Sequence, residues 1–176
     1  MKAFNQSVKI IYYWQFQLNG LSVHVASSHR GAVMVSIGFA IEKRFMTELI
    51  SSAPKAELFE DRKQNEGLIE IIEAYLKGDN PAINVPWDIT VTPFMYNVYR
   101  SACEIPYGET KTYKDIAFMI GTPKGARAVG QALKKNPLCI LIPCHRVVAF
   151  NGLGGFNSGI DTKQYLLNLE QGQLIV

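Results

Sequence analysis

The chain of 176 residues is long enough for one large domain or two small ones. Hydrophobic residues make up 48% and charged residues 19%, as in a globular protein with a real core. No apolar run approaches the roughly 20 residues of a membrane span, which argues against a membrane protein. Asn5, Gln6 and Ser7 are polar where a signal peptide would be apolar, so we expect a cytoplasmic protein, nucleoid-associated in a prokaryote. The odd number of cysteines favours reduced thiols: Cys103, Cys139 and Cys144.

Basic residues are unevenly distributed. Residues 1–90 hold nine Lys and Arg against ten Asp and Glu, whereas residues 91–176 hold nine against five. Between 111 and 146, one acid (Asp115) accompanies seven basic residues: Lys111, Lys114, Lys124, Arg127, Lys134, Lys135 and Arg146. Such a segment suits phosphate binding. By charge alone, a solvated basic surface is the simpler interpretation.

The sequence pattern of the N-terminal part predicts a small antiparallel sheet followed by a helix. The predicted strands are Val8–Tyr13, Leu21–Ala26 and Ala32–Ala40, with turns at Asn19-Gly20 and His29–Gly31. Residues 41–50 fit a strand or a helix equally well. Apolar spacing predicts a helical segment over Ala56–Leu76, and residues 78–92 then form a linker or crossing strand.

From Pro93 onward the pattern becomes helical. The predicted helices are Phe94–Cys103, Thr112–Ile120, Lys124–Leu133 and Asp161–Glu170. The second and third helices flank Gly121-Thr122-Pro123, as in a helix-turn-helix, although the pattern taken alone favours an αα-hairpin of no special purpose. Leu138–Ile142 is expected to be a buried strand or extended segment, and a glycine-rich loop spans Asn151–Gly159. We therefore predict a mixed α/β (α+β) protein with domains at 1–90 and 91–176.

Cys144 and His145 are the residues best suited to carry out a chemical reaction. A thiolate is a strong nucleophile, and an adjacent His and Arg146 can favour it. For the pair in isolation, a buried structural cysteine beside a capping histidine is the better explanation. The apolar residues before Pro143 and the later glycines shift the balance towards a buried reactive thiol near a ligand. Zinc on Cys139, Cys144 and His145 would lack a fourth ligand, so we predict no metal site.

The segment Pro143-Cys144-His145-Arg146-Val147 resembles the active-site motif of the O6-alkylguanine-DNA alkyltransferases. The resemblance covers 91–176, where further blocks occur in the family's order: Thr92-Pro93-Phe94, Ile105-Pro106-Tyr107-Gly108, Thr112-Tyr113, Ala126-Arg127-Ala128-Val129-Gly130, Asn136-Pro137, Lys163, Leu166-Leu167 and Glu170. The first ninety residues match only in size and in plausible sheet-plus-helix content. The family implies a ribonuclease-H-like first domain and a winged-helix-like second domain.

The resemblance implies a one-time transfer of the alkyl group from O6-alkylguanine to Cys144, with O4-alkylthymine as a further candidate substrate. His145 would take the thiol proton through a water, Glu170 would orient His145, and Asn136 would tie this network to the turn. No cofactor is implied.

The resemblance also implies contacts to the base. Tyr113 would donate to the departing guanine, Lys163 would assist nearby, and Ser158 would bind the alkylated oxygen. The main-chain carbonyls of Cys144 and Val147 would accept hydrogen bonds from the guanine amino group. The predicted substrate-binding residues are Val147, Ser158, Gly155 and Phe156.

The implied partner is double-stranded DNA containing alkylated guanine, bound by a monomer with no membrane association. The damaged base must leave the stack, and Arg127 would fill the gap from a helix in the minor groove, where little sequence is read. The other predicted DNA-binding residues are Ala126, Ala128, Gly130, Thr112, Lys124, Lys134 and Lys135. Without the resemblance, close helix packing would explain the small residues around Arg127.

The chain departs from the family at Met95, Tyr99 and Phe156, where Gln, Trp and Tyr are usual. Three rival functions are considered. Cys144 counts strongly against a non-repairing lesion binder of related type, which would lack this cysteine. A transcription regulator would use residues 112–133 and would not need Cys144. A cysteine hydrolase would need an oxyanion hole that the sequence does not reveal.

Overall fold

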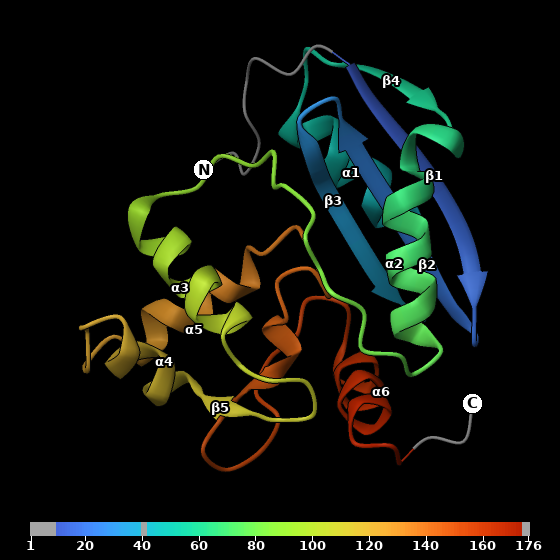
Figure 1. Ribbon diagram of the computed structural model, residues 1–176. Helices are drawn as coiled ribbons and strands as arrows, with labels where there is room; N and C mark the ends of the chain where they lie inside the picture. The colour runs from blue at the N-terminus through green and yellow to red at the C-terminus, as the bar shows by residue number, and fades with distance from the viewer. Residues whose placement is uncertain (1–9, 40–41, 174–176) are drawn as a thin grey trace. The chain divides into compact units, whose positions relative to one another are not determined.

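The computed structural model describes residues 10–39 and 42–173. The chain forms two compact units, one ending at Val91 and the other beginning at Thr92. The first holds a four-stranded sheet with helices, and the second is mainly helical (Figure 1). This arrangement confirms the predicted mixed α/β class. The finer ribonuclease-H-like and winged-helix assignments stay predictions.

The first unit is built on an antiparallel meander of β1 (Ile10–Leu18), β2 (Leu21–Ser28) and β3 (Gly31–Gly38). The first turn is made by Asn19 and Gly20, whose φ angles of 53° and 76° suit the tight turn of a two-residue hairpin. The short strand β4 (Glu57–Glu60) pairs in parallel with β1, which gives the order β3-β2-β1-β4. The predicted first strand lies partly outside the described residues and extends further, to Leu18.

The segment 41–50, which the sequence left open, lies largely in helix α1 (Glu42–Ser52). The prediction of one helical stretch over Ala56–Leu76 is wrong in its first half. That half contains β4 and a 3-10 turn, η1 (Lys63–Asn65), and α2 starts only at Glu66 and runs to Leu76. Pairing with β1 and packing of Leu58 against the cluster around α1 override the helical spacing.

Gly31 begins β3 where the chain at Pro86 crosses close by. Ala32 N–H donates to the Pro86 carbonyl at 2.8 Å, and the φ of Gly31 is +144°. A Cβ at this position would overlap the Pro86 carbonyl. We expect Gly31→Ala to lower the free energy of unfolding by about 2–3 kcal/mol in urea titrations. Gly20→Ala, where nothing lies within 4 Å, is the matched control and carries only a backbone cost of about 1 kcal/mol.

The second unit contains α3 (Pro93–Cys103), α4 (Tyr113–Met119), α5 (Ala126–Lys134) and α6 (Ile160–Glu170). The two-residue strands β5 (Lys111–Thr112) and β6 (Val147–Val148) pair in parallel. Thr112 caps α4 in a reciprocal pair with Asp115. All four helices were predicted, although α5 begins two residues later than expected. None of the helices in the described residues could span a bilayer.

The expectation of a strand or extended segment over Leu138–Ile142 is wrong. Residues 139–141 form a turn between the bridge residue Leu138 and a bend at Ile142. Ile142 N–H donates to the Leu138 carbonyl at 2.8 Å, and Ile140 has a φ of 69°. The segment is nevertheless fully buried, as its apolar side chains require. It leads into the 3-10 turn η2 (Cys144–Arg146), so the turns decide where the Cys144 thiol lies.

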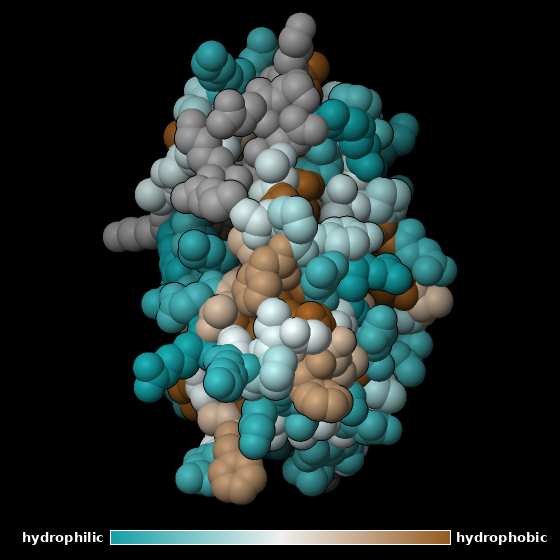
Figure 2. Space-filling model, turned by 90° about the vertical axis from the view of Figure 1, so that its left-hand side faces the viewer, coloured by the Kyte–Doolittle hydropathy of each residue, from teal (hydrophilic) through white to brown (hydrophobic). Residues whose placement is uncertain are grey.

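Figure 2 turns the left-hand side of Figure 1 towards the viewer. Hydrophilic side chains cover much of this face, with brown and tan hydrophobic ones among them. Phe118 and Met119 at the end of α4 are exposed hydrophobic residues of the second unit. Exposed apolar residues that are scattered singly are normal on a protein surface and need no special partner.

Candidate functional site

A pocket of about 550 Å³ lies in the second unit. Helix α5, the loop before α6, Tyr113 and Cys144 form its wall. The lining residues are Tyr113, Ala126, Arg127, Gly130, Gln131, Leu133, Lys134, Cys144, Gly155, Phe156 and Asn157. The thiol therefore borders a cavity large enough for a nucleobase-sized ligand.

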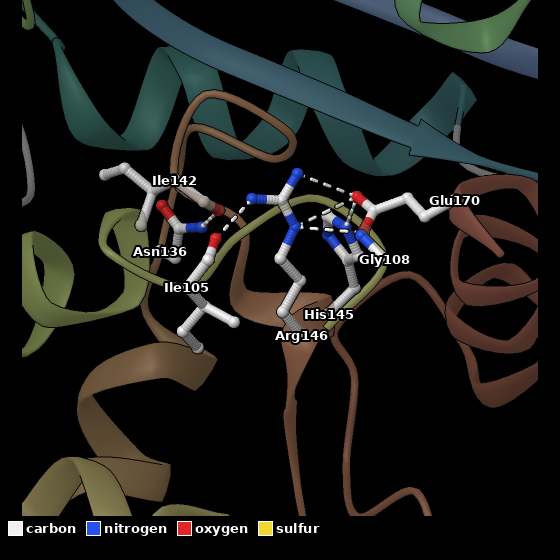
Figure 3. A network of polar contacts seen from close by, with 7 residues as sticks. All are labelled: Ile105, Gly108, Asn136, Ile142, His145, Arg146 and Glu170. Carbon is white, nitrogen blue, oxygen red and sulfur yellow. Dashed lines mark hydrogen bonds and ion pairs between the residues drawn. The ribbon is translucent and has the colours of Figure 1, made fainter. Parts of the chain in front are cut away.

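Asn136 holds the Cys144 thiol in place. Its Nδ2 donates to the Ile142 carbonyl at 2.9 Å and to the Cys144 Sγ at 3.1 Å, while its Oδ1 accepts from Leu138 N–H at 3.0 Å. Figure 3 shows the amide of Asn136 directed at Ile142. One buried side chain thus fixes both the turn and the sulfur.

Burial raises the pKa of the Cys144 thiol above its usual value. The hydrogen bond from Asn136 and the positive charge of Lys163 act in the opposite direction and lower that pKa in part. The sequence assigned this effect to His145 and Arg146, but the Arg146 guanidinium binds Glu170 and the Ile105 carbonyl, and the charge that lowers the pKa of Cys144 is that of Lys163. A thiol of this kind needs a base to become a nucleophile at neutral pH.

Glu170 is the centre of a buried polar network (Figure 3). Its carboxylate accepts from His145 Nε2 at 2.7 Å and from Gly108 N–H at 2.9 Å. Arg146 donates to it through Nε, at 3.0 Å to each oxygen, and through Nη2 at 2.9 Å. Arg146 Nη1 also donates to the Ile105 carbonyl at 2.8 Å. The network joins the end of α6, η2 and the turn after α3.

The histidine of this network is neutral and has a defined tautomer. Burial lowers the pKa of His145, and the nearby charges of Arg146 and Lys163 add to this, although Glu170 counteracts them. A carboxylate can only accept, so the ring proton lies on Nε2, and Nδ1 carries the basic lone pair. His145 is therefore suited to act as a proton acceptor.

Lys163 is buried although lysines are usually solvated. Its Nζ donates to the Val147 carbonyl at 2.6 Å and lies 5.9 Å from the centre of the Tyr113 ring. Burial lowers the pKa of Lys163 to about 8. The ammonium group thus supports both the main chain after η2 and a residue of the pocket wall.

Tyr113 anchors the glycine-rich loop to α4. Its hydroxyl donates to the Gly155 carbonyl at 3.3 Å, and a Cβ on Gly154 would lie 2.8 Å from the Tyr113 ring. Gly154 has a φ of +71°, so only glycine fits here. Burial raises the pKa of Tyr113, with a further contribution from Cys144, so the phenol keeps its proton and remains a donor.

The predicted site residues fall into three groups. Eight line the pocket: Tyr113, Ala126, Arg127, Gly130, Lys134, Cys144, Gly155 and Phe156. Five form the buried support described above: Asn136, His145, Val147, Lys163 and Glu170. The remainder lie outside the lining, either on the surface or in capping positions: Thr112, Lys124, Ala128, Lys135 and Ser158.

Sequence reasoning missed three lining residues, Gln131, Leu133 and Asn157. Gln131 follows Arg127 by four positions, so helical spacing alone could have placed it on the same face. No comparable signal existed for Asn157, because loop residues have no fixed period. The described residues contain no group of three or more metal-binding side chains.

Comparison with known proteins identifies the family. Residues 93–172 match the model of the 6-O-methylguanine DNA methyltransferase, DNA binding domain. The chain is 43% identical to the methylated-DNA–protein-cysteine methyltransferase of Methanosarcina barkeri, over 68% of this chain and 76% of that protein. It is 37% identical to the inducible enzyme of that name from Bacillus subtilis, over 90% of both chains. The chain belongs to this methyltransferase family.

The fold of the family extends over both units. The crystal structure of O6-methylguanine methyltransferase from Mycobacterium tuberculosis matches with a TM-score of 0.79 and 30% identity, covering 94% of this chain and 95% of that one. A structure of the same protein in complex with DNA matches with a TM-score of 0.76 and 29% identity, covering 92% and 94%. The first unit, which the sequence motifs left unassigned, is therefore part of the shared fold.

Proposed function

We propose that this protein repairs double-stranded DNA by transferring the alkyl group of O6-alkylguanine to Cys144, once per molecule. The observation that carries the proposal is the Cys144 thiol, held by Asn136 at the wall of a pocket whose other side is α5. Membership of the methylated-DNA–protein-cysteine methyltransferase family supports the reaction. The protein acts as a cytoplasmic monomer, without a cofactor.

The nucleophile is generated by the buried network. The thiol proton passes through a water to Nδ1 of His145, while Glu170 holds the Nε2 proton and stabilises the imidazolium that forms. The Cys144 sulfur attacks the alkyl carbon, the carbon–O6 bond breaks, and the electron pair remains on guanine. A stable thioether results, and nothing in the site returns the cysteine to its thiol.

The leaving base is stabilised from the pocket wall. Tyr113 stays protonated because its pKa is raised. Its single hydroxyl proton turns from the Gly155 carbonyl, 3.3 Å away, to the guanine as negative charge develops. Lys163 holds the Val147 carbonyl at 2.6 Å, and that carbonyl keeps a second lone pair with which to accept from the guanine amino group. Gly155 and Phe156 complete the contact surface for the base.

Helix α5 supplies the main contacts with DNA. Arg127 and Lys134 are exposed on it, Lys135 is exposed at its C-cap, and Lys124 is exposed just before it. These cations bind phosphates, and Arg127 at the pocket edge takes the place of the flipped base. Ala126, Ala128 and Gly130 are small enough for close approach to the minor groove, and the complex of the Mycobacterium tuberculosis relative with DNA supports this partner.

The proposal is tested by the mass of the protein after mixing with a duplex that carries one O6-methylguanine. We expect one methyl group per protein, located on the peptide that contains Cys144, and no change with an undamaged duplex. Tight, lesion-selective binding without a mass change would instead indicate a non-repairing lesion binder. A protein with neither mass change nor lesion preference would be a general DNA-binding protein.

The rate of transfer should stay constant as the pH falls through 6.5. Because burial lowers the pKa of His145, its neutral, proton-accepting form persists below the usual histidine value. The rate should decline only at lower pH, when His145 becomes protonated. Single-turnover rates between pH 5.5 and 8 measure this, and a midpoint at or above 6.5 would contradict the assignment of His145 as base.

A further inference from the structure

Tyr99 is a residue of α3 to which the proposed reaction assigns no part. Its side chain is fully buried, and its hydroxyl donates to the Ala132 carbonyl of α5 at 3.0 Å. The family usually has Trp at this place, so the hydroxyl is a feature of this chain. The bond joins α3 to the last turn of α5, shortly before Asn136, whose amide donates to the sulfur of Cys144.

The end of α5 is wound more tightly than a regular α-helix. Asn136 N–H donates to the Leu133 carbonyl at 3.0 Å, whereas in a regular α-helix it would donate to the carbonyl of Ala132. The Ala132 carbonyl instead accepts from Lys135 N–H at 3.0 Å and from the Tyr99 hydroxyl, which together use its two lone pairs. The hydroxyl therefore replaces Asn136 N–H as the second donor to this carbonyl.

This tight turn decides where the Asn136 side chain lies. Its Nδ2 donates to the Cys144 Sγ at 3.1 Å and to the Ile142 carbonyl at 2.9 Å. A 3-10 turn and an α-helix differ by about 20° in rotation per residue, so a regular α-helical end would carry the amide away from the sulfur. Because the hydrogen bond from Asn136 lowers the pKa of the buried thiol, its loss would leave less thiolate.

We propose that Tyr99 is a positioning residue, whose hydroxyl keeps the end of α5 tightly wound and thereby holds Asn136 against the sulfur of Cys144. The inference rests on the proposed role of Cys144 as the acceptor. Burial raises the pKa of the Tyr99 phenol, and the charge of Cys144 raises it further, so the two groups lie within electrostatic reach. The phenol consequently keeps its proton and remains a donor to the Ala132 carbonyl.

The test is the pH dependence of the reaction of Cys144 with iodoacetamide, followed by the mass of the peptide that contains this cysteine. Iodoacetamide reacts with thiolates, so the rate reports the state of the thiol without any transfer from DNA. Tyr99→Phe removes only the hydroxyl, and the rate between about pH 7 and 9 should fall about three- to tenfold and recover at higher pH. Tyr75→Phe is the matched control: it removes the hydroxyl of a buried tyrosine in α2 of the first unit and should leave the rate unchanged.

A merely structural role of Tyr99 would lower the melting temperature of Tyr99→Phe without moving the pH dependence of the thiol, and that result would overturn the inference. The path through Asn136 has its own test. When Asn136→Ala is already present, adding Tyr99→Phe should slow the reaction no further. A further decrease of the same size would mean that the hydroxyl acts on the thiol directly, against the inference.

The proposed function fails in a different way. A protein whose Cys144 reacts with iodoacetamide as expected, but which accepts no methyl group from a duplex with O6-methylguanine, would overturn the proposed alkyl transfer. The effect of Tyr99→Phe on the thiol would then still stand, because iodoacetamide measures it without DNA.

Discussion

Replacing Cys144 by serine is expected to abolish alkyl transfer while the damaged duplex remains bound. A hydroxyl can still accept the hydrogen bond that Asn136 Nδ2 gives to the sulfur at 3.1 Å, so the turn should persist. An alcohol is a far weaker nucleophile than a thiol, and removal of a nucleophile commonly costs at least about 10³-fold in rate. Single-turnover transfer and duplex affinity, measured on the same preparation, separate the loss of chemistry from a loss of binding.

The chain supplies its own controls for this experiment. Cys103 and Cys139 are the other thiols; burial raises the pKa of both, to about 11 for Cys103, and neither lines the pocket. Cys103→Ser and Cys139→Ala should therefore transfer the methyl group as the natural chain does. Residual transfer in Cys144→Ser, or its loss in Cys139→Ala, would place the acceptor sulfur elsewhere.

The helices of the second unit could be predicted from the sequence because their signals are local, whereas the reactive segment was identified through the family resemblance. Thr92 and Thr112 cap helices directly before apolar-periodic runs, and Pro93 begins α3. The strand-turn pattern around Asn19-Gly20 is equally local. In these places the conformational preference of the residues agrees with the final packing, so few alternative conformations compete with the native one.

The missed features depend on contacts between distant residues. β4 exists because it pairs with β1, 47 positions earlier in the chain. The segment from Leu138 to Ile142 turns because Asn136 accepts from Leu138 N–H and donates to the Ile142 carbonyl. The sequence did not predict that Lys163 and Glu170 are buried, because charged residues are usually exposed. The groups that bind their charges, the Val147 carbonyl and the Arg146 guanidinium, lie at least 16 residues away in the chain. The resemblance named both as site residues, but only the structure shows what they bind.

Replacing Glu170 by glutamine is expected to be the most damaging substitution outside the pocket. The carboxylate receives hydrogen bonds from His145, Arg146 and Gly108, all of them donors. A glutamine NH₂ would face one of these donors, and the buried Arg146 charge would lose its counterion. Breaking a buried pair in this way costs about 3–5 kcal/mol, out of the 5–15 kcal/mol that is typical of folded domains.

The same substitution should slow alkyl transfer beyond its effect on stability. Hydrogen bonding and charge from Glu170 raise the pKa of His145 against the effect of burial, so without them the imidazole is a weaker base. Glu66→Gln is the matched control, because its pair with Arg62 at 3.3 Å is exposed and contributes at most about 0.5 kcal/mol. Denaturant unfolding and single-turnover transfer at low temperature, where the folded form predominates, test both effects. A Glu170→Gln protein with wild-type stability and rate would mean that Arg146 and His145 find other partners, and that the network of Figure 3 does not generate the nucleophile.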